Sequence, residues 1–395
     1  MDGGLEGQVR TLYRAALLIF VVTIVIGILN GLDVWEPEHN LLLTHVHAGT
    51  LGWITLAVVG AALAMFGDRA DAEVVASARR VTWVTVVATL VYVAAFIAGT
   101  GIYRPIAGTL MLVAIVWALI WVGGRYRASR KTTFQTGIYL AMISLTIGAV
   151  LGVLLGLFIA NGELPGMSTE MAGNLAGAHP PAMLIGYLVL AGVAITDWLL
   201  DGPAGRLGGL VIWGLFLAGI VANVAFVFNL EPLIQVFSVL EVVAIILYLI
   251  RMWPRVRPAA WSGGGGTNFA RLSVVGLAVG IALLVYTVQL FVSGVIDPEA
   301  GVGPLGVLIA FDHSMFIGVM TNALFAAVAA SALSAASGLV MWGTNLGLVG
   351  FLIGLVTDSA VLKRISTPIM GAALLIGIVM YLVRLGSARA TPGPA

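Results

Sequence analysis

Two histidines separated by a single residue stand near the start of a long apolar run, in the stretch LLLTHVHAGTLGW. His45 and His47 are two of only five histidines in the chain. Imidazole is the commonest metal ligand among side chains, and an ionisable group inside an apolar segment is costly enough to suggest a function. Residues two apart on an α-helix point about 200° apart, so we expect that His45 and His47 do not bind the same metal ion.

Two further histidines lie in similar apolar surroundings, His179 in NLAGAHPPAMLIGY and His313 in FDHSMFIGVM. Any one of them is as readily explained as a neutral imidazole bonded to a neighbouring helix. Three apolar segments that each present histidine at a similar depth favour the other reading, a metal ion or haem shared between helices. His39 precedes the second apolar run, and we expect it on the surface.

The elements that position these histidines are membrane-spanning helices. Of the 395 residues, 60% are hydrophobic and only 9% are charged, where a soluble domain carries about a quarter. We predict an all-α polytopic membrane protein with a single transmembrane domain over 1–395, because runs of about 20 apolar residues cross a bilayer as helices. The predicted spans are 13–33, 41–66, 81–100, 105–123, 134–160, 171–199, 207–229, 232–252, 269–295, 304–334, 338–357 and 367–386. No sequence repeat argues for a two-fold transporter architecture.

The positive charges support this number of spans. With the N-terminus inside, sixteen of the nineteen lysines and arginines fall on the cytoplasmic side. Arg69 and Arg389 are two of these sixteen. The exceptions are Arg104, Lys363 and Arg364. We therefore expect a bacterial or archaeal plasma membrane protein with both termini in the cytoplasm and the histidines toward the outer face. Residues 1–12 are polar, and we expect the first span to serve as its own insertion signal.

The composition of the chain and the number of available ligands exclude several classes of metal site and cofactor. The chain has no cysteine, which excludes thiolate metal sites, iron–sulfur clusters and covalently attached haem, and its net charge of +1 gives no sign of a nucleic-acid partner. Zinc or copper alone requires three or four protein ligands. Haem b requires one or two imidazoles, an apolar slot, and cations for its propionates. Lys363 and Arg364 are the only adjacent cations on the predicted outer side, although a solvated loop pair is the commoner role of such residues.

The chain resembles the catalytic subunit I of the haem–copper oxidase superfamily in its whole pattern of spans, with histidine on the second, sixth and tenth. VHAGTL looks like the oxidase segment on helix 2 that supplies a ligand of the low-spin haem. On helix 10, Phe311-Asp312-His313 stands where the oxidases have His-x-His, and AHPP around His179 looks like their GHPE copper motif. The resemblance implies His47 and His313 as haem ligands, His45 beside a propionate or at the rim, and Lys363 and Arg364 against the propionates.

The chain is also similar to the NnrS family of haem-containing membrane proteins. Their His-x-His-x4-Gly pattern is matched by His45, His47 and Gly52, and their His-x4-Gly pattern by His313 and Gly318. Such proteins have a nitric oxide-linked role.

Departures from the oxidase pattern limit the chemistry. Residues 207–229 contain no histidine where the oxidases place two copper ligands, and Phe311 and Met183 replace the high-spin haem ligand and a tyrosine. A copper held by His179 alone has too few ligands. We therefore expect no copper and no reduction of oxygen to water, and we expect His179 either to bind a second haem or to be a packed remnant.

The sequence is compatible with three functions. The first is electron transfer through a bis-histidine low-spin haem b between the second and tenth helices, which makes an oxidoreductase role possible and implies quinol, a cytochrome or another redox subunit as partner. The second is a nitric oxide-linked function with a five-coordinate haem. The third is a twelve-helix transporter without haem, in which the histidines relay protons or bind a substrate.

Overall fold

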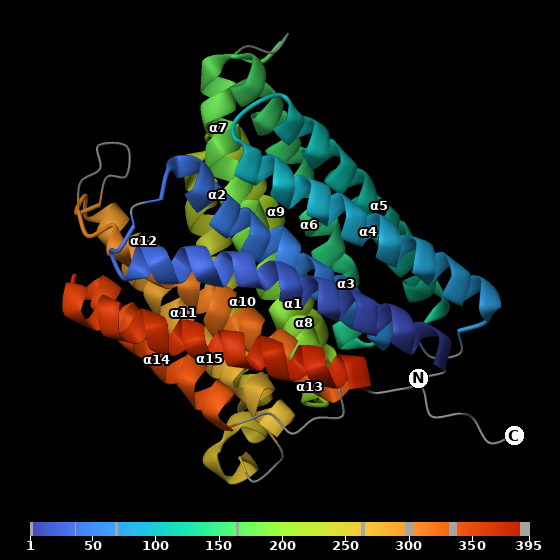
Figure 1. The fold of residues 1–395 in the computed structure, drawn as a ribbon. Coiled ribbons are helices and arrows are strands. Elements are labelled where there is room, and N and C mark those ends of the chain that lie inside the picture. Colours follow the sequence, from blue (N-terminus) through green and yellow to red (C-terminus); the bar gives the residue numbers. More distant parts are fainter. Residues whose placement is uncertain are drawn as a thin grey trace, which may run out of the picture.

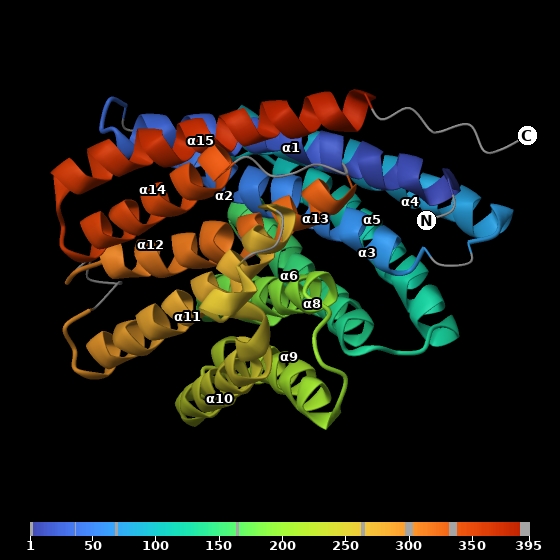
Figure 2. The same cartoon turned by 90° about the horizontal axis from the view of Figure 1, so that it is seen from below.

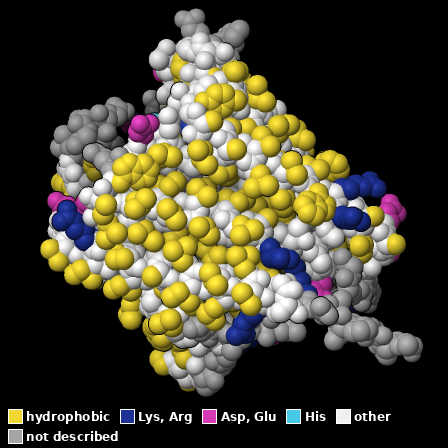
Figure 3. Space-filling model, viewed as in Figure 1, with side chains coloured by type: hydrophobic (Ala, Val, Ile, Leu, Met, Phe, Trp, Pro, Cys, Tyr) yellow, Lys and Arg dark blue, Asp and Glu magenta, His cyan; other side chains and the backbone are white. Residues whose placement is uncertain are grey.

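The computed structural model describes residues 3–35, 37–67, 70–162, 166–261, 265–296, 303–331 and 338–387. Arg69 and Arg389, which the topology prediction placed in the cytoplasm, lie outside these ranges. Within the described residues, twelve helices are long and apolar enough to cross a membrane, so the protein is an all-α, multi-pass bundle. Figure 3 agrees: one broad face is apolar, and charged side chains gather near its edges.

The bundle consists of three consecutive groups of four spans (Figure 1). In each group the second span is a composite of an α-helix, a π-helix and another α-helix. The first group is α1 (Gly3–Gly31), α2 (His39–His47) with η1 (Ala48–Thr55) and α3 (Leu56–Met65), α4 (Ala72–Ala98) and α5 (Tyr103–Ala128). The second is α6 (Thr133–Asn161), α7 (Thr169–Pro181) with η2 (Ala182–Val189) and α8 (Leu190–Leu199), α9 (Arg206–Val227) and α10 (Glu231–Val256). A short 3₁₀ turn, η3 (Pro258–Ala260), precedes the third: α11 (Gly265–Val292), α12 (Gly306–His313) with η4 (Ser314–Thr321) and α13 (Asn322–Ser331), α14 (Gly338–Val356) and α15 (Ala360–Ser387).

The three composite spans form the centre of the molecule. In their most apolar windows 94%, 83% and 83% of the residues are buried, whereas the corresponding share in the other nine described spans is 56% or less. The π-helices η1 and η2 both contact η4. The remaining helices surround this centre, with α1 against α15 and the α9–α10 pair on the opposite side (Figure 2). Histidines on the composite spans are therefore held by helices that have protein on nearly every side.

The repeat of four spans is visible in the packing of the composite spans as well. Each π-helix is eight residues long, and Gly52, Gly186 and Gly318 occupy the same place in it. Each of these glycines lies against the first helix of its own group. Small residues allow such close approach of helices in membranes. The molecule thus has an internal three-fold structural repeat, although no repeat was evident in its sequence.

Local signals explain most helix ends. Asp71 and Ser168 accept hydrogen bonds from backbone N–H groups at the starts of α4 and α7, and Thr132 forms a capping box with Gln135 at the start of α6. Several helices extend beyond the predicted spans; α4, for example, begins at Ala72, where the span was predicted from 81. The first helix begins at Gly3 and the last at Ala360, so Lys363 and Arg364 lie in the first turn of α15 and not in a loop.

Candidate functional site

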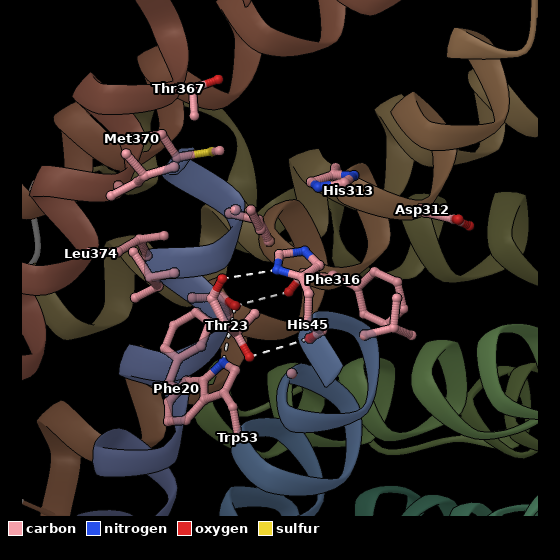
Figure 4. Close-up of a pocket in the computed structure, with 18 of the residues that line it drawn as sticks. Phe20, Thr23, His45, Trp53, Asp312, His313, Phe316, Thr367, Met370 and Leu374 are labelled. Carbon is pink, nitrogen blue, oxygen red and sulfur yellow. Dashed lines mark hydrogen bonds between the residues drawn. The ribbon is translucent and has the colours of Figure 1, made fainter. Parts of the chain in front are cut away.

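His45 of α2 and His313 of α12 face each other across the first and third groups. Their ring centres are 6.4 Å apart and the ring planes are 25° from parallel (Figure 4). The resemblance implied His47 as the partner of His313; in the structure His45 lies opposite His313 and His47 lies opposite His179. His47 leaves the same turn of α2 in another direction, which brings it to the second group. His45 and His47 thus face different imidazoles, and the expectation that they do not bind the same metal ion stays a prediction.

The first pair borders a large apolar cavity between α1, the composite spans of groups one and three, α14 and α15. Its volume is about 840 Å³, counting its open part. The lining residues are Phe20, Thr23, Ile24, Gly27, Ile28, His45, Val46, Gly49, Trp53, Ile54, Asp312, His313, Phe316, Ile317, Thr321, Phe351, Thr367, Met370, Gly371 and Leu374.

His47 and His179 form a second facing pair. Their ring centres are 6.5 Å apart and their planes are 12° from parallel. His47 also stacks on Phe96 of α4, with ring centres 4.1 Å apart. The second pair therefore joins the first group to the second, as the first pair joins the first group to the third.

All four imidazoles are oriented in the same way, each through Nδ1. Within its own helix, Nδ1 of His47 donates to the carbonyl of Leu43 at 2.7 Å and Nδ1 of His313 to that of Ile309 at 2.9 Å. Nδ1 of His45 donates to Thr23 O of α1 at 2.9 Å, and Nδ1 of His179 to Gly148 O of α6 at 3.0 Å. A carbonyl only accepts, so in the neutral ring the proton is on Nδ1 and the lone pair on Nε2. Metal-binding histidines are held in this way.

Two glycines make room for the pairs. A β-carbon on Gly27 of α1 would lie 2.9 Å from Cε1 of His45, and one on Gly152 of α6 would lie 2.8 Å from Cε1 of His179. Both distances are shorter than van der Waals contact. Glycine is therefore required at these positions for the observed ring placements, a role that is not evident from the sequence alone.

The three cations that departed from the predicted charge asymmetry differ in burial and in their partners. Arg104 of α5 is 9% exposed, stands 4.5 Å from the ring centre of Phe96, and donates to Asn40 Oδ1 and Phe96 O, each at 3.1 Å. Lys363 is one helical turn before Thr367, which lines the cavity. Arg364 pairs with Asp33 at 3.0 Å, and 57% of its side chain is exposed. Neither Lys363 nor Arg364 is itself among the lining residues.

The donor set suits a metal that brings most of its own ligands. Within the described ranges there is no group of three or more His, Asp or Glu residues placed to hold a bare ion. Two imidazoles bound to one metal through bonds of about 2 Å have ring centres roughly 6 Å apart. Both pairs match that spacing. An iron porphyrin, which supplies four equatorial nitrogens and needs an apolar slot, is the group that these residues fit.

Among known protein families no model matches the chain, and no curated protein is significantly similar to it. The fold and composition define a class, a multi-pass helical membrane protein. Its function must be inferred from the site.

The four histidines could be found from the sequence, but other residues around the two histidine pairs could not. Arg104 stood out only as an exception to the charge asymmetry, and it carries a buried Nε without a hydrogen-bond partner. Gly27 and Gly152 are spaced alike relative to the residues whose carbonyls hold His45 and His179, Thr23 and Gly148. No residue type marks this spacing in the sequence, because Thr23 and Gly148 hold the rings through their backbone carbonyls.

Proposed function

We propose that the chain is a membrane-embedded b-type haem protein that binds its haem iron between His45 and His313 and transfers electrons. One observation carries the proposal. Two imidazoles from different groups of helices face each other beside a large apolar cavity, with ring centres 6.4 Å apart. The Nδ1–H of each ring donates a hydrogen bond to a backbone carbonyl. A haem bound by two imidazoles exchanges single electrons.

The surrounding residues have defined roles in this proposal. Thr23 O and Ile309 O hold the two rings with Nε2 available, and Gly27 leaves room for His45. Trp53 stacks on Phe20 with ring centres 4.8 Å apart and donates from Nε1 to Thr321 Oγ1 at 3.1 Å, which keeps one wall of the cavity rigid. Lys363 and Arg364, near the Thr367 end, supply positive charge for the propionates.

Asp312 does not orient the neighbouring imidazole, since Nδ1 of His313 donates to the carbonyl of Ile309. Asp312 instead lines the cavity (Figure 4). The pairing of all four described intramembrane histidines favours electron transfer over the nitric oxide-linked alternative, because a gas-binding iron needs an open coordination position.

The proposed setting is the plasma membrane of a bacterium or archaeon, with both termini in the cytoplasm and the haem toward the outer face. This follows from the excess of Lys and Arg on one side of the predicted topology. The electron donor would be quinol or a cytochrome, or another redox subunit. Oxygen reduction is not proposed, because the copper-binding histidines of the oxidases are missing from 207–229.

The test is the visible and electron paramagnetic resonance spectrum of protein purified after expression in haem-replete cells. We expect a Soret band and a low-spin ferric signal, unchanged by carbon monoxide after reduction. His45→Ala and His313→Ala should each remove the signal of this site, and His39→Ala, which changes an exposed histidine, should leave it intact. The absence of any Soret band would refute the proposal and favour a transporter. A large shift with carbon monoxide would favour a gas-binding role.

A further inference from the structure

The three π-helices provide a common frame in which the histidines can be compared. The residue directly before the π-helix is His47 in the first group, Pro181 in the second and His313 in the third. The residue two positions earlier is His45, His179 and Phe311, respectively. The first pair combines the earlier position of group one with the later position of group three. The second pair combines the earlier position of group two with the later position of group one, so the two pairs are equivalent.

The equivalence extends to the hydrogen bonds and the preceding helices. At the earlier position, His45 and His179 donate to a carbonyl on the first helix of their own group, Thr23 O and Gly148 O. At the later position, His47 and His313 donate within their own helix. One turn beyond Thr23 and Gly148 are Gly27 and Gly152, whose missing side chains leave room for the imidazoles. The second pair therefore repeats the first in its Nδ1 hydrogen bonds and in the glycine beside one ring. Their aromatic neighbours differ, since His47 stacks on Phe96 whereas His313 meets Phe351 edge-on.

A third combination remains, the earlier position of group three with the later position of group two, and it contains no histidine. There the two positions are Phe311 and Pro181, and Leu284 of α11 stands where the other groups have Gly27 and Gly152. Leu284 is 9% exposed and packs in the main core. Histidine pair and glycine are thus present together in two places and absent together in the third. The association follows the space that each imidazole occupies, and it shows that the second pair is accommodated in the same way as the first.

Arg104 is an independent observation at the second pair. Its guanidinium contacts the ring of Phe96, on which His47 also stacks. Its side chain is buried, and its Nε has no hydrogen-bond partner. Asn40 Oδ1 and Phe96 O accept from its guanidinium, and no carboxylate among the described residues pairs with it, so its charge can attract an anion. The two propionates of a haem are such anions.

We propose that His47 and His179 form a second bis-imidazole haem site, with Arg104 as the cation for its propionates. The proposal goes beyond the function proposed above and shares its assumption that the chain binds haem. Two imidazoles do not hold a bare metal ion stably, and the described residues around them offer no third ligand of the kind a bare ion needs. The chain would then carry two haems, one on each side of α2.

The test is the haem content per chain, measured as the pyridine haemochrome of full-length protein purified in detergent, together with its ferric paramagnetic resonance spectrum. We expect two haems in the unchanged chain, one in His179→Ala or His47→Ala, and one in His45→Ala or His313→Ala. His39→Ala is the matched control and should keep two. The haem retained in each variant shows that the chain is folded. His179→Met retains a ligand and should replace one bis-imidazole signal by an imidazole–thioether signal.

The outcomes separate the two proposals. One haem per chain, unaffected by His179→Ala and His47→Ala, would overturn the second site and leave the first. One haem that is lost in those two variants and kept in His45→Ala and His313→Ala would overturn the function proposed above and support the second site. No haem at all would overturn both.

Discussion

Gly27 of α1 lies against the imidazole of His45, so closely that a β-carbon at position 27 would stand 2.9 Å from Cε1 of the ring. The ring is held from the same helix by the carbonyl of Thr23. Helix α1 thus both orients His45 and limits the space it occupies. Neither effect requires a polar or charged side chain on α1.

Gly27→Ala should therefore displace the His45 ring and remove the haem of the first site. The control is Gly7→Ala on the same helix, where a β-carbon meets nothing within 4 Å. Both changes raise the helix propensity by about 1 kcal/mol, so propensity does not distinguish them. Haem content and the low-spin ferric signal are the measurements. Full haem binding by Gly27→Ala would show that His45 is not a ligand in this orientation.

Gly152→Ala should act in the same way on the second site, since its β-carbon would stand 2.8 Å from Cε1 of His179. We expect loss of one haem of two, with the signal of the His45–His313 site retained. Gly173→Ala on α7, at a position with open space, is the control. If both variants keep the same haem content as the unchanged chain, the clearance at Gly152 has no bearing on ligand binding.

The cations should tune the two haems separately. Removal of positive charge near a haem stabilises its oxidised form and lowers its midpoint potential. Lys363→Gln together with Arg364→Gln should lower the potential of the first haem, and Arg104→Gln that of the second, each by on the order of tens of millivolts. Redox titration followed by absorbance measures both. A shift of the same haem by both variants would contradict the assignment of cations to sites.

The buried ion pair between Asp197 of α8 and Arg251 of α10 should matter for stability. Their side chains are 2% and 4% exposed, and Arg251 also donates to the carbonyl of Pro203. Asp197→Ala leaves Arg251 buried without its carboxylate and should cost about 3–5 kcal/mol. Asp33→Ala breaks the Arg364–Asp33 pair, whose side chains are 57% and 47% exposed, and should cost about 0–1 kcal/mol. Thermal unfolding in detergent compares the two, and equal losses would contradict the difference in burial.

Asn322 of α13 and Asn345 of α14 exchange two hydrogen bonds, at 2.8 and 3.1 Å. Such bonds between membrane helices contribute about 0.6–1.7 kcal/mol. Asn322→Ala, Asn345→Ala and the double variant form a cycle that should give a coupling energy in this range. Additive effects would mean that the two amides do not stabilise each other.

The twelve spans could be predicted because each is an apolar run set apart by breakers and checked by the charge asymmetry. The ends of α1 and α15 could not, since helices continue into polar residues such as those around Lys363 when neighbouring helices support them. The four histidines were found because ionisable groups are scarce in the spans. Electron transfer, the haem ligands and the oxidase resemblance stay predictions.

The pairing of the histidines could not be predicted from local periodicity. A helical wheel shows that His45 and His47 diverge, but not which helix each one meets. That depends on contacts between residues far apart in the chain, such as Thr23 with His45 and Gly148 with His179. The π-helices, which follow directly after His47 and His313, also carry no sequence mark beyond glycines that are common in membrane helices.

A single turn of α2 carries one member of each pair. A rotation of that turn about the helix axis moves His45 and His47 together, and a geometry that relaxes one pair strains the other. In the proposed two-haem chain, haem affinity on one side of α2 would then depend on the occupancy of the other side, and reciprocity would make the dependence equal in both directions. The two places are mechanically linked through about four residues of backbone.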